Sequence, residues 1–272
     1  MSVNSNNSRN LTGVNSRDSN LGSQYRLLHL YYDIMNLYGD WANVEVLSLE
    51  LKSRRNSVVI DRKSIGDDVG FADYDFIYIG SGTERSLIAC LSDIVKYKDS
   101  LIERINDGVS VLATGNSHEI FGSAITDSNG IRHEVLGLLD FETIQGNTRV
   151  TGDCVCRASF LQEKLIGFIN RAGTGQVGNV ERPFSQELGP SVNDDSSMEG
   201  IIFKNLLGTY MTGPVLVRNP PLLSYFADKL TRETTTLSNN SANAERDDDS
   251  AFFKFQTEAY KMALSELTAR VK

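Results

Sequence analysis

The 272-residue sequence predicts an α/β fold with a mainly parallel sheet flanked by helices. Apolar runs of strand length alternate with stretches of helical periodicity, and strands that alternate with helices of this length form βαβ units. Two of the runs also lead into short glycine-containing loops, Gly80–Glu84 and Thr114–Ser117. The composition, 40% hydrophobic and 23% charged, is that of a globular protein that can bury a sizeable core.

The expected elements follow one another along the first half of the chain. Four apolar or β-branched runs are expected to be strands, at residues 26–32, 57–60, 75–79 and 109–113. Two longer stretches with helical periodicity are expected to be helices, at residues 36–52 and about 86–106. A further short helix should follow the turn at Thr114-Gly115-Asn116. Because ligands bind beyond the carboxyl ends of parallel strands, the two glycine-containing loops mark the expected site.

The two ends of the chain differ in composition from the middle. Residues 1–23 hold six Asn and six Ser and too little apolar surface to offset the entropy of ordering, so a disordered leader is expected. The main domain is expected at 24–231 and a polar linker at 232–250. Residues 251–272 predict an amphipathic helix from apolar side chains on one face: Phe253, Tyr260, Leu264, Leu267 and Val271. Packing on its own domain is favoured over packing on a partner.

Charge and cysteine content exclude several classes of function. With 27 basic and 35 acidic residues, the chain has a net charge of −8 and is poorly suited to bind nucleic acid through general electrostatics. No apolar run approaches the roughly 18–20 residues that span a bilayer. Three cysteines are too few for a disulfide framework, so a cytoplasmic protein is expected.

Neither a nucleotide cofactor nor a metal is predicted. The segment Gly80-Ser81-Gly82 lacks the spacing of phosphate-binding and dinucleotide-binding loops. It is interpreted as a tight turn, or as a row of backbone N–H groups that could stabilise an oxyanion. Cys154 and Cys156 share one face of an expected strand, but no His or carboxylate lies at a ligand spacing, so packing is favoured over zinc binding.

Two other side chains could in principle carry chemistry. Cys90 falls on the apolar stripe of the expected helix at 86–106 and is interpreted as a core residue. His118 comes three residues after Gly115 and is interpreted as a helix-surface or capping histidine. Neither is expected to act in catalysis.

Four segments, taken in order, carry a resemblance to a known family: Asn36–Asp40, Gly80–Arg85, Asn147–Asp153 and Lys204–Pro214. On these segments the chain resembles, over most of residues 26 to 230, the cobyric-acid-synthase-like (CobB/CobQ-like) class I glutamine amidotransferases. Within that family it resembles the amidotransferase subunits of bacterial lipid II isoglutaminyl synthase. The resemblance implies a flavodoxin-like class I amidotransferase fold. It also implies a heterodimer in which ammonia from glutamine passes to a Mur-ligase-like (MurT-type) subunit, which uses ATP to amidate D-glutamate in the peptidoglycan stem peptide.

The resemblance also places the family's reacting groups on this sequence. Releasing ammonia from an amide takes a cysteine thiolate and a histidine that manages its proton. The family's cysteine falls on Gly115 and its histidine on Thr212. Glycine offers no nucleophile, and a threonine hydroxyl holds its proton too tightly to act as a base near pH 7. Because loss of a nucleophile alone costs on the order of a millionfold in rate, glutaminase chemistry is expected to be lost.

Three further positions carry over from the family. Arg149 falls on the arginine that holds glutamine, and an arginine fork suits a carboxylate. Its other interpretation is an exposed strand arginine in a salt bridge. The backbone amides of Gly82 and Asn116 correspond to the oxyanion hole. Glycine at position 115 would also relax an elbow that a side chain would strain by roughly 1–3 kcal/mol.

Three functions remain open at this point. The first is an amidotransferase-family subunit that no longer hydrolyses glutamine, a pseudoenzyme that still orders its ligase partner for peptidoglycan synthesis. The second is an active glutaminase with an unusual nucleophile. The third is a non-catalytic module that binds glutamine or another amino acid for regulation. Absence of both reacting side chains favours the first and the third.

Overall fold

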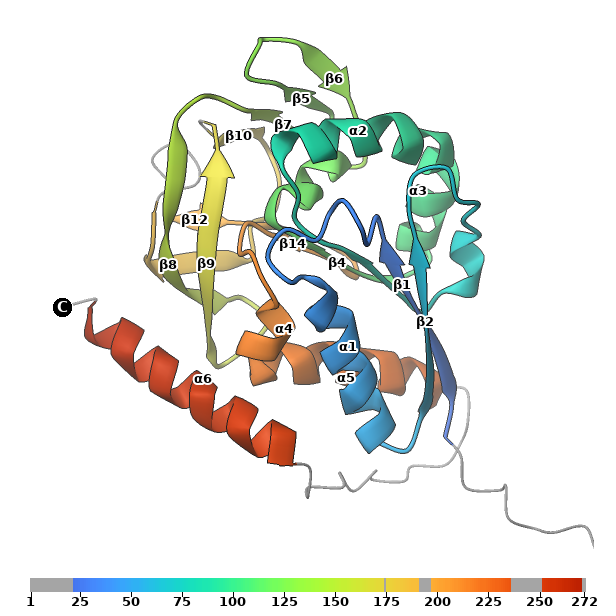
Figure 1. The fold of residues 1–272 in the computed structure, drawn as a ribbon, viewed down its shortest axis with the longest axis vertical. Coiled ribbons are helices and arrows are strands. Elements are labelled where there is room, and N and C mark those ends of the chain that lie inside the picture. Colours follow the sequence, from blue (N-terminus) through green and yellow to red (C-terminus); the bar gives the residue numbers. More distant parts are fainter. Residues whose placement is uncertain (1–21, 174, 191–196, 236–250, 271–272) are drawn as a thin grey trace, which may run out of the picture.

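A six-stranded sheet forms the centre of the protein, as a computed structural model shows for residues 22–173, 175–190, 197–235 and 251–270 (Figure 1). The strand order is β13-β14-β4-β3-β1-β2. The bounds are β1 (Gln24–Leu30), β2 (Ser57–Lys63), β3 (Phe76–Ile79), β4 (Ser110–Thr114), β13 (Ile201–Phe203) and β14 (Leu206–Thr209). Every neighbouring pair is parallel except β13 and β14. The predicted α/β fold with a mainly parallel sheet is confirmed.

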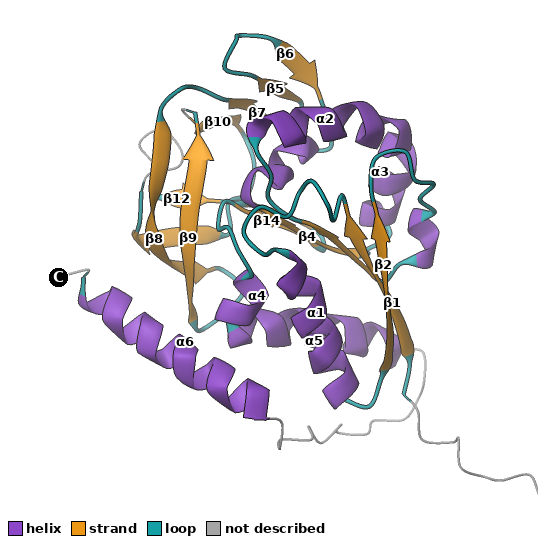
Figure 2. Ribbon diagram, in the orientation of Figure 1, coloured by secondary structure: helices purple, strands orange, loops and turns teal. Residues whose placement is uncertain are grey.

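Helices cover both faces of this sheet (Figure 2). One face carries α1 (Trp41–Ser53), α4 (Val215–Arg218) and α5 (Pro220–Thr235), and the other carries α2 (Glu84–Ile94) and α3 (Lys98–Asn106). Successive strand residues supply the two cores in alternation, because side chains on a strand point to opposite faces. Phe76 and Tyr78 lie in the core with α1, while Ile77 and Ile79 lie in the core with α2. Near-continuous apolar strands are therefore buried on both sides.

The second half of the chain adds two smaller sheets that the sequence did not predict. One has the order β10-β7-β5-β6 and the other β12-β11-β8-β9. Their bounds are β5 (Ala124–Thr126), β6 (Arg132–Glu134), β7 (Phe141–Ile144), β8 (Arg149–Ala158), β9 (Lys164–Ala172), β10 (Gly175–Gly178), β11 (Phe184–Leu188) and β12 (Met198–Glu199). Cys154 and Cys156 on β8 are fully buried in the core with α1. Their place is that of packing residues.

Two expected helices differ from the structure. The helix expected at 36–52 begins only at Trp41, because Gly39 has a φ of 74° and Asn36 caps the start by accepting the N–H of Trp41 at 2.9 Å. The helix expected at 86–106 is broken by a 3-10 turn, Val95–Tyr97. At this break the Tyr97 ring packs edge-on against Phe71, with centroids 5.8 Å apart. Because the helical periodicity of the sequence continues through residues 95–97, the sequence did not reveal the break.

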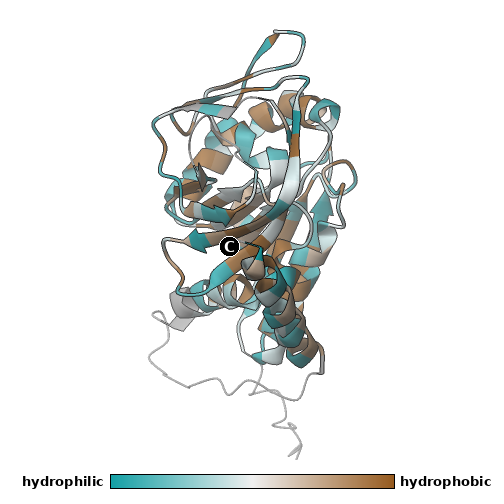
Figure 3. Ribbon diagram, turned by 90° about the vertical axis from the view of Figure 1, so that its left-hand side faces the viewer, coloured by the Kyte–Doolittle hydropathy of each residue, from teal (hydrophilic) through white to brown (hydrophobic). Residues whose placement is uncertain are grey.

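Helix α6 (Ala251–Ala269) packs on β8 and β9 on the side of the molecule seen in Figure 3. Tyr260 and Leu267 are buried against Val155 and Ile166, and the Tyr260 hydroxyl donates to the carbonyl of Lys164 at 2.6 Å. The expected leader at 1–23 and linker at 232–250 lie largely outside the described residues, although α5 continues to Thr235. None of the described helices combines the length and apolar character needed to cross a bilayer.

Candidate functional site

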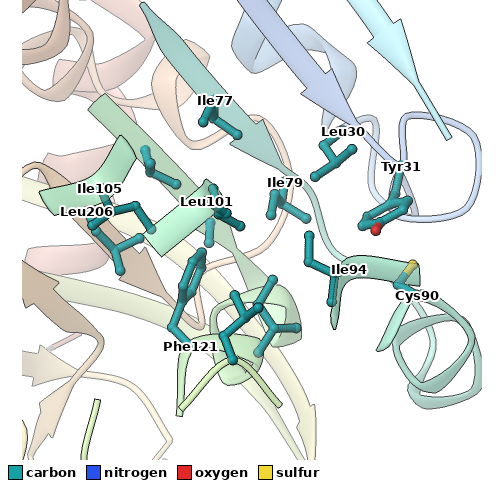
Figure 4. Close-up of a cluster of buried hydrophobic side chains, with 14 of the residues drawn as sticks. Leu30, Tyr31, Ile77, Ile79, Cys90, Ile94, Leu101, Ile105, Phe121 and Leu206 are labelled. Carbon is teal, nitrogen blue, oxygen red and sulfur yellow. The ribbon is translucent and has the colours of Figure 1, made fainter. Parts of the chain in front are cut away.

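A sharp strand-to-helix turn follows β4 and forms the centre of the expected site. The 3-10 helix η3 (Gly115–Phe121) starts directly after Thr114, and Gly115 has a φ of 63°. Phe121 from this helix points into the core with Leu101 and Leu206, which anchors the turn (Figure 4). Only glycine adopts such a left-handed conformation without a steric penalty. The glycine is therefore suited to the elbow that the sequence predicts.

The loop after β3 covers Gly115. A Cβ atom built on Gly115 would lie 2.3 Å from the Cβ of Ser81. Asp40 holds Ser81 in place, because its Oδ2 accepts the Ser81 N–H at 2.9 Å and the Ser81 hydroxyl at 2.5 Å. Asp40 is fully buried, and burial raises the pKa of its carboxyl. Ser81 therefore fills the space where a side chain at position 115 would begin.

The two expected oxyanion donors, Gly82 and Asn116, do lie side by side. The N–H of Gly82 donates to the side-chain oxygen Oδ1 of Asn116 at 3.1 Å. A hydrogen-bond donor aimed at a developing negative charge has to be free to reach it. In this structure the Gly82 N–H is already bonded to the side-chain carboxamide of Asn116.

Arg149 and Thr212 lie at the same cavity. Arg149 begins β8 and donates to Oε1 of Glu84 at 2.7 Å and to Oδ1 of Asn170 at 2.8 Å. Its side chain is 45% exposed, ion-paired with Glu84 and part of the cavity lining. The salt-bridged strand arginine is therefore observed, and the role of holding glutamine stays a prediction. The Thr212 hydroxyl donates to the carbonyl of Phe168 at 3.0 Å. The hydroxyl hydrogen is therefore used in a bond to the backbone at the edge of the cavity.

These residues surround a cavity of about 50 Å³ at the carboxyl ends of β3 and β4. Most of the residues that line it have polar side chains: Tyr38, Ser81, Thr83, Glu84, Asn116, Glu119, Gln145, Arg149, Asn170, Arg171 and Thr212. Of the five positions taken from the family, Gly82, Asn116, Arg149 and Thr212 line it. Gly115 does not line the cavity, and the Ser81 side chain lies against it. The structure therefore brings four of the five positions to one cavity, while Ser81 lies between the fifth, Gly115, and that cavity.

Glu119 is the main site residue that sequence reasoning missed. It is buried, and it accepts hydrogen bonds from the Tyr210 hydroxyl at 3.1 Å and from Nε2 of Gln145 at 3.3 Å. Burial raises the pKa of its carboxyl to about 7. Glu119 directly precedes the apolar pair Ile120-Phe121, but it stands among other polar residues of the turn, so the sequence contained little signal for it. Arg171, whose guanidinium lies 4.5 Å from the Tyr210 ring centroid, gave no such signal, since its place depends on the pairing of β8 and β9.

His118 is not a surface histidine, as the sequence suggested, but is fully buried behind the elbow. Its Nδ1 lies 2.7 Å from the carbonyl oxygen of Gly115, and its Nε2 lies 3.0 Å from Nε2 of Gln176. Burial lowers the pKa of the imidazole to about 3, so the ring is neutral near pH 7. A neutral ring that donates from Nδ1 can accept the Gln176 amide hydrogen at Nε2. His118 thus braces the turn from the side away from the cavity.

The cysteines lie away from the cavity. Cys90 is buried in the core with α2, as predicted, and burial raises the pKa of its thiol to about 12. Cys154 and Cys156 lie in the opposite core. Over the part of the chain that the structure describes, no three His, Cys, Asp or Glu side chains gather at a metal-binding spacing.

Comparison with known proteins assigns the family. The model of the CobB/CobQ-like glutamine amidotransferase domain matches residues 26–220. The chain belongs to this family. The matched region contains the whole elbow and cavity, whereas almost all of α5 and the whole of α6 follow it. The resemblance that the four sequence segments indicated is confirmed.

Two curated relatives within this family have the same name, lipid II isoglutaminyl synthase (glutamine-hydrolyzing) subunit GatD. The protein of Staphylococcus aureus (strain N315) is 31% identical over 208 residues, which are 75% of this chain and 83% of the relative. The protein of Streptococcus pneumoniae (strain ATCC BAA-255 / R6) is 33% identical over 216 residues, 78% of this chain and 82% of the relative. A solved glutamine amidotransferase from Thermotoga maritima aligns at 14% identity and a TM-score of 0.42, covering 91% of this chain and 97% of that chain.

Proposed function

We propose that this chain is the GatD-like subunit of a lipid II isoglutaminyl synthase and that it has lost glutaminase chemistry. Identities of 31% and 33% to two GatD subunits, over most of both chains, support the assignment to such a complex. The loss rests on one observation. Gly115, on which the family's cysteine falls in this proposal, has no side chain and lies against Ser81, so no thiol is available there to attack an amide.

The partner in this proposal is a Mur-ligase-like (MurT-type) subunit, joined with this chain in a cytoplasmic heterodimer. The partner uses ATP to amidate the α-carboxyl of D-glutamate in the peptidoglycan stem peptide on lipid II. This chain binds and orders the partner, and free ammonia replaces the ammonia that a glutaminase would deliver. The chain then acts in cell wall biogenesis as a pseudoenzyme subunit.

Co-purification and an ammonia assay test this proposal. The full chain should co-purify with the Mur-ligase-like subunit encoded in the same genome. The complex should release no ammonia from glutamine above the rate of the partner alone. Ammonia release that disappears in an Arg149→Ala variant would contradict the proposal, because it would show a working glutamine site with an unusual nucleophile.

One observation favours a second function, a module that binds a free amino acid. The ion pair between Arg149 and Glu84 lies at the cavity and offers both charges that a zwitterion needs. Isothermal calorimetry of the isolated chain with single amino acids tests it. A binding signal that Arg149→Ala removes, without any partner present, would support this second function.

A further inference from the structure

We propose that Ser81 and Asn116 are specificity-determining residues that exclude a side-chain carboxamide, such as that of glutamine, from this cavity. The inference deepens the proposed function, since it concerns the same site. Restoring sulfur and imidazole at Gly115 and Thr212 would not reopen the site, because the side chains that close it from within would remain.

Ser81 closes the floor of the cavity. A Cβ on residue 115 would lie 2.3 Å from the Ser81 Cβ and 3.3 Å from its Cα. Because the conflicting atoms are a Cβ and a Cα, no change of side-chain rotamer at Ser81 relieves the conflict. The backbone cannot move away freely either, since the Ser81 N–H and hydroxyl are both held by the buried carboxylate of Asp40. Side chains at positions 81 and 115 therefore exclude each other.

Asn116 occupies the place of the substrate carbonyl. An amide carbonyl that is to be attacked at the elbow needs the Gly82 N–H to stabilise the charge on its oxygen. The Asn116 Oδ1 accepts that N–H at 3.1 Å. This carboxamide is tethered to the chain, so it does not lose the translational and rotational freedom that a free ligand loses on binding. Glutamine would have to displace it.

The space that remains agrees with this exclusion. The cavity of about 50 Å³ has room for only a few water molecules. Its charged pair, Arg149 and Glu84, could still contact the head of an amino acid. The carboxamide end of glutamine would have to enter the region that Ser81 and Asn116 already fill.

The first arm of the test uses matched variants at position 81. Ser81→Gly removes the conflicting Cβ, whereas Ser81→Ala removes the hydroxyl but keeps the Cβ. Gly115→Ala should therefore lower the melting temperature most in the parent and in Ser81→Ala, and less in Ser81→Gly, where the backbone cost of a side chain at a φ of 63° remains but the conflict with the Ser81 Cβ is gone. Equal losses in the Ser81→Ala and Ser81→Gly backgrounds would overturn the role given to Ser81.

The second arm measures glutamine binding to the isolated full chain by calorimetry. Ser81→Gly/Asn116→Ala should bind glutamine about tenfold more tightly than the parent, the gain expected when one hydrogen-bond donor is freed. Ser81→Gly/Asn116→Asp keeps an acceptor for the Gly82 N–H and should not gain. Circular dichroism confirms that each variant is folded.

Two results of this second arm would overturn the proposal: a parent that binds glutamine as tightly as Ser81→Gly/Asn116→Ala, or a folded Ser81→Gly/Asn116→Ala that binds it no better than the parent. Neither arm involves the ligase partner. Failure here therefore leaves the proposed function intact, and failure of co-purification leaves this inference intact.

Discussion

The elbow after β4 and helix α6 are held in place by opposite kinds of contact. At the elbow, buried or half-buried polar groups satisfy one another over short distances, in the pairs Asp40–Ser81, Gly82–Asn116 and Gly115–His118. Helix α6 is held along one face by a small apolar cluster and a few hydrogen bonds, while Phe255 and Met262 on its outer face are 65% and 74% exposed.

This difference indicates which part of the molecule should tolerate amino-acid substitution. The elbow lies inside the region that matches the family, and each of its groups depends on a neighbour, so a single substitution disturbs several contacts. Helix α6 lies beyond that region and adds a layer to sheet strands that are already paired. We therefore expect large effects at the elbow, and effects at α6 that depend on which face is changed.

The largest effect is expected for Gly115→Cys. A side chain at a φ of 63° costs about 1–2 kcal/mol, and the conflict with Ser81 adds about 1–3 kcal/mol of overpacking. We expect the free energy of unfolding to fall by about 2–5 kcal/mol, measured by chemical denaturation. A variant as stable as the parent would show that the elbow can accommodate a side chain at position 115, which would contradict the tight packing described for it.

Gly66→Ala is the matched control for that experiment. Gly66 has a φ of 87°, but a Cβ there would meet no atom within 4 Å. Replacing it should lower the free energy of unfolding only by the cost of a side chain in a left-handed backbone conformation, about 1–2 kcal/mol. The difference between the two variants therefore measures the crowding by Ser81.

An intermediate effect is expected on the inner face of α6. Leu267→Ala removes a buried side chain from the cluster with Val155 and Ile166 and should cost about 2 kcal/mol. Met262→Ala, on the outer face, should change stability by less than about 0.5 kcal/mol. Both values come from the same denaturation experiment. Similar costs for the two variants would mean that the outer face is covered in solution, which would break the comparison.

A further expected effect is a change in how stability depends on pH. Burial raises the pKa of Glu119 to about 7, whereas an unfolded chain has a Glu pKa near 4.3. Between these values the native state binds more protons than the unfolded state, so Glu119 makes stability fall as the pH rises. Glu119→Gln removes this titration and should gain stability relative to the parent from about pH 4.5 to 7.5.

The comparison of the two proteins isolates Glu119 from other buried groups. Glu199, whose pKa burial also raises to about 7, titrates in both of them. His118, whose lowered pKa makes stability fall toward acid, is likewise present in both. Curves of unfolding free energy against pH that run parallel for the parent and Glu119→Gln would contradict the assignment.

The parallel core of the fold could be predicted because its signal is local. The run Phe76–Ile79 carries only apolar and aromatic side chains, as a strand buried on both faces must, and it leads directly into a glycine turn. The two smaller sheets could not be predicted in this way. Their strands pair at long range, as when Arg149 lies opposite Ala172, and such registers leave little trace in the sequence around each strand.

The site was predictable to a similar extent. Gly82, Asn116, Arg149 and Thr212 were found because family motifs fix them, and the structure brings them to one cavity. The side-chain contacts among them were not predictable. Whether Asn116 points to solvent or accepts the Gly82 N–H depends on how two loops from different strands approach each other. His118 was misjudged because a histidine in a short polar turn is usually exposed, and here strand β14 covers it.

The source of the nitrogen in amidated lipid II tests the central claim most directly. The complex of this chain with its ligase partner is supplied with ATP, lipid II, ¹⁵N-labelled ammonium and unlabelled glutamine, and the product is examined by mass spectrometry. We predict that the new amide carries ¹⁵N and that omitting glutamine changes nothing. Unlabelled amide that forms from glutamine, and is lost with Arg149→Ala, would contradict the account.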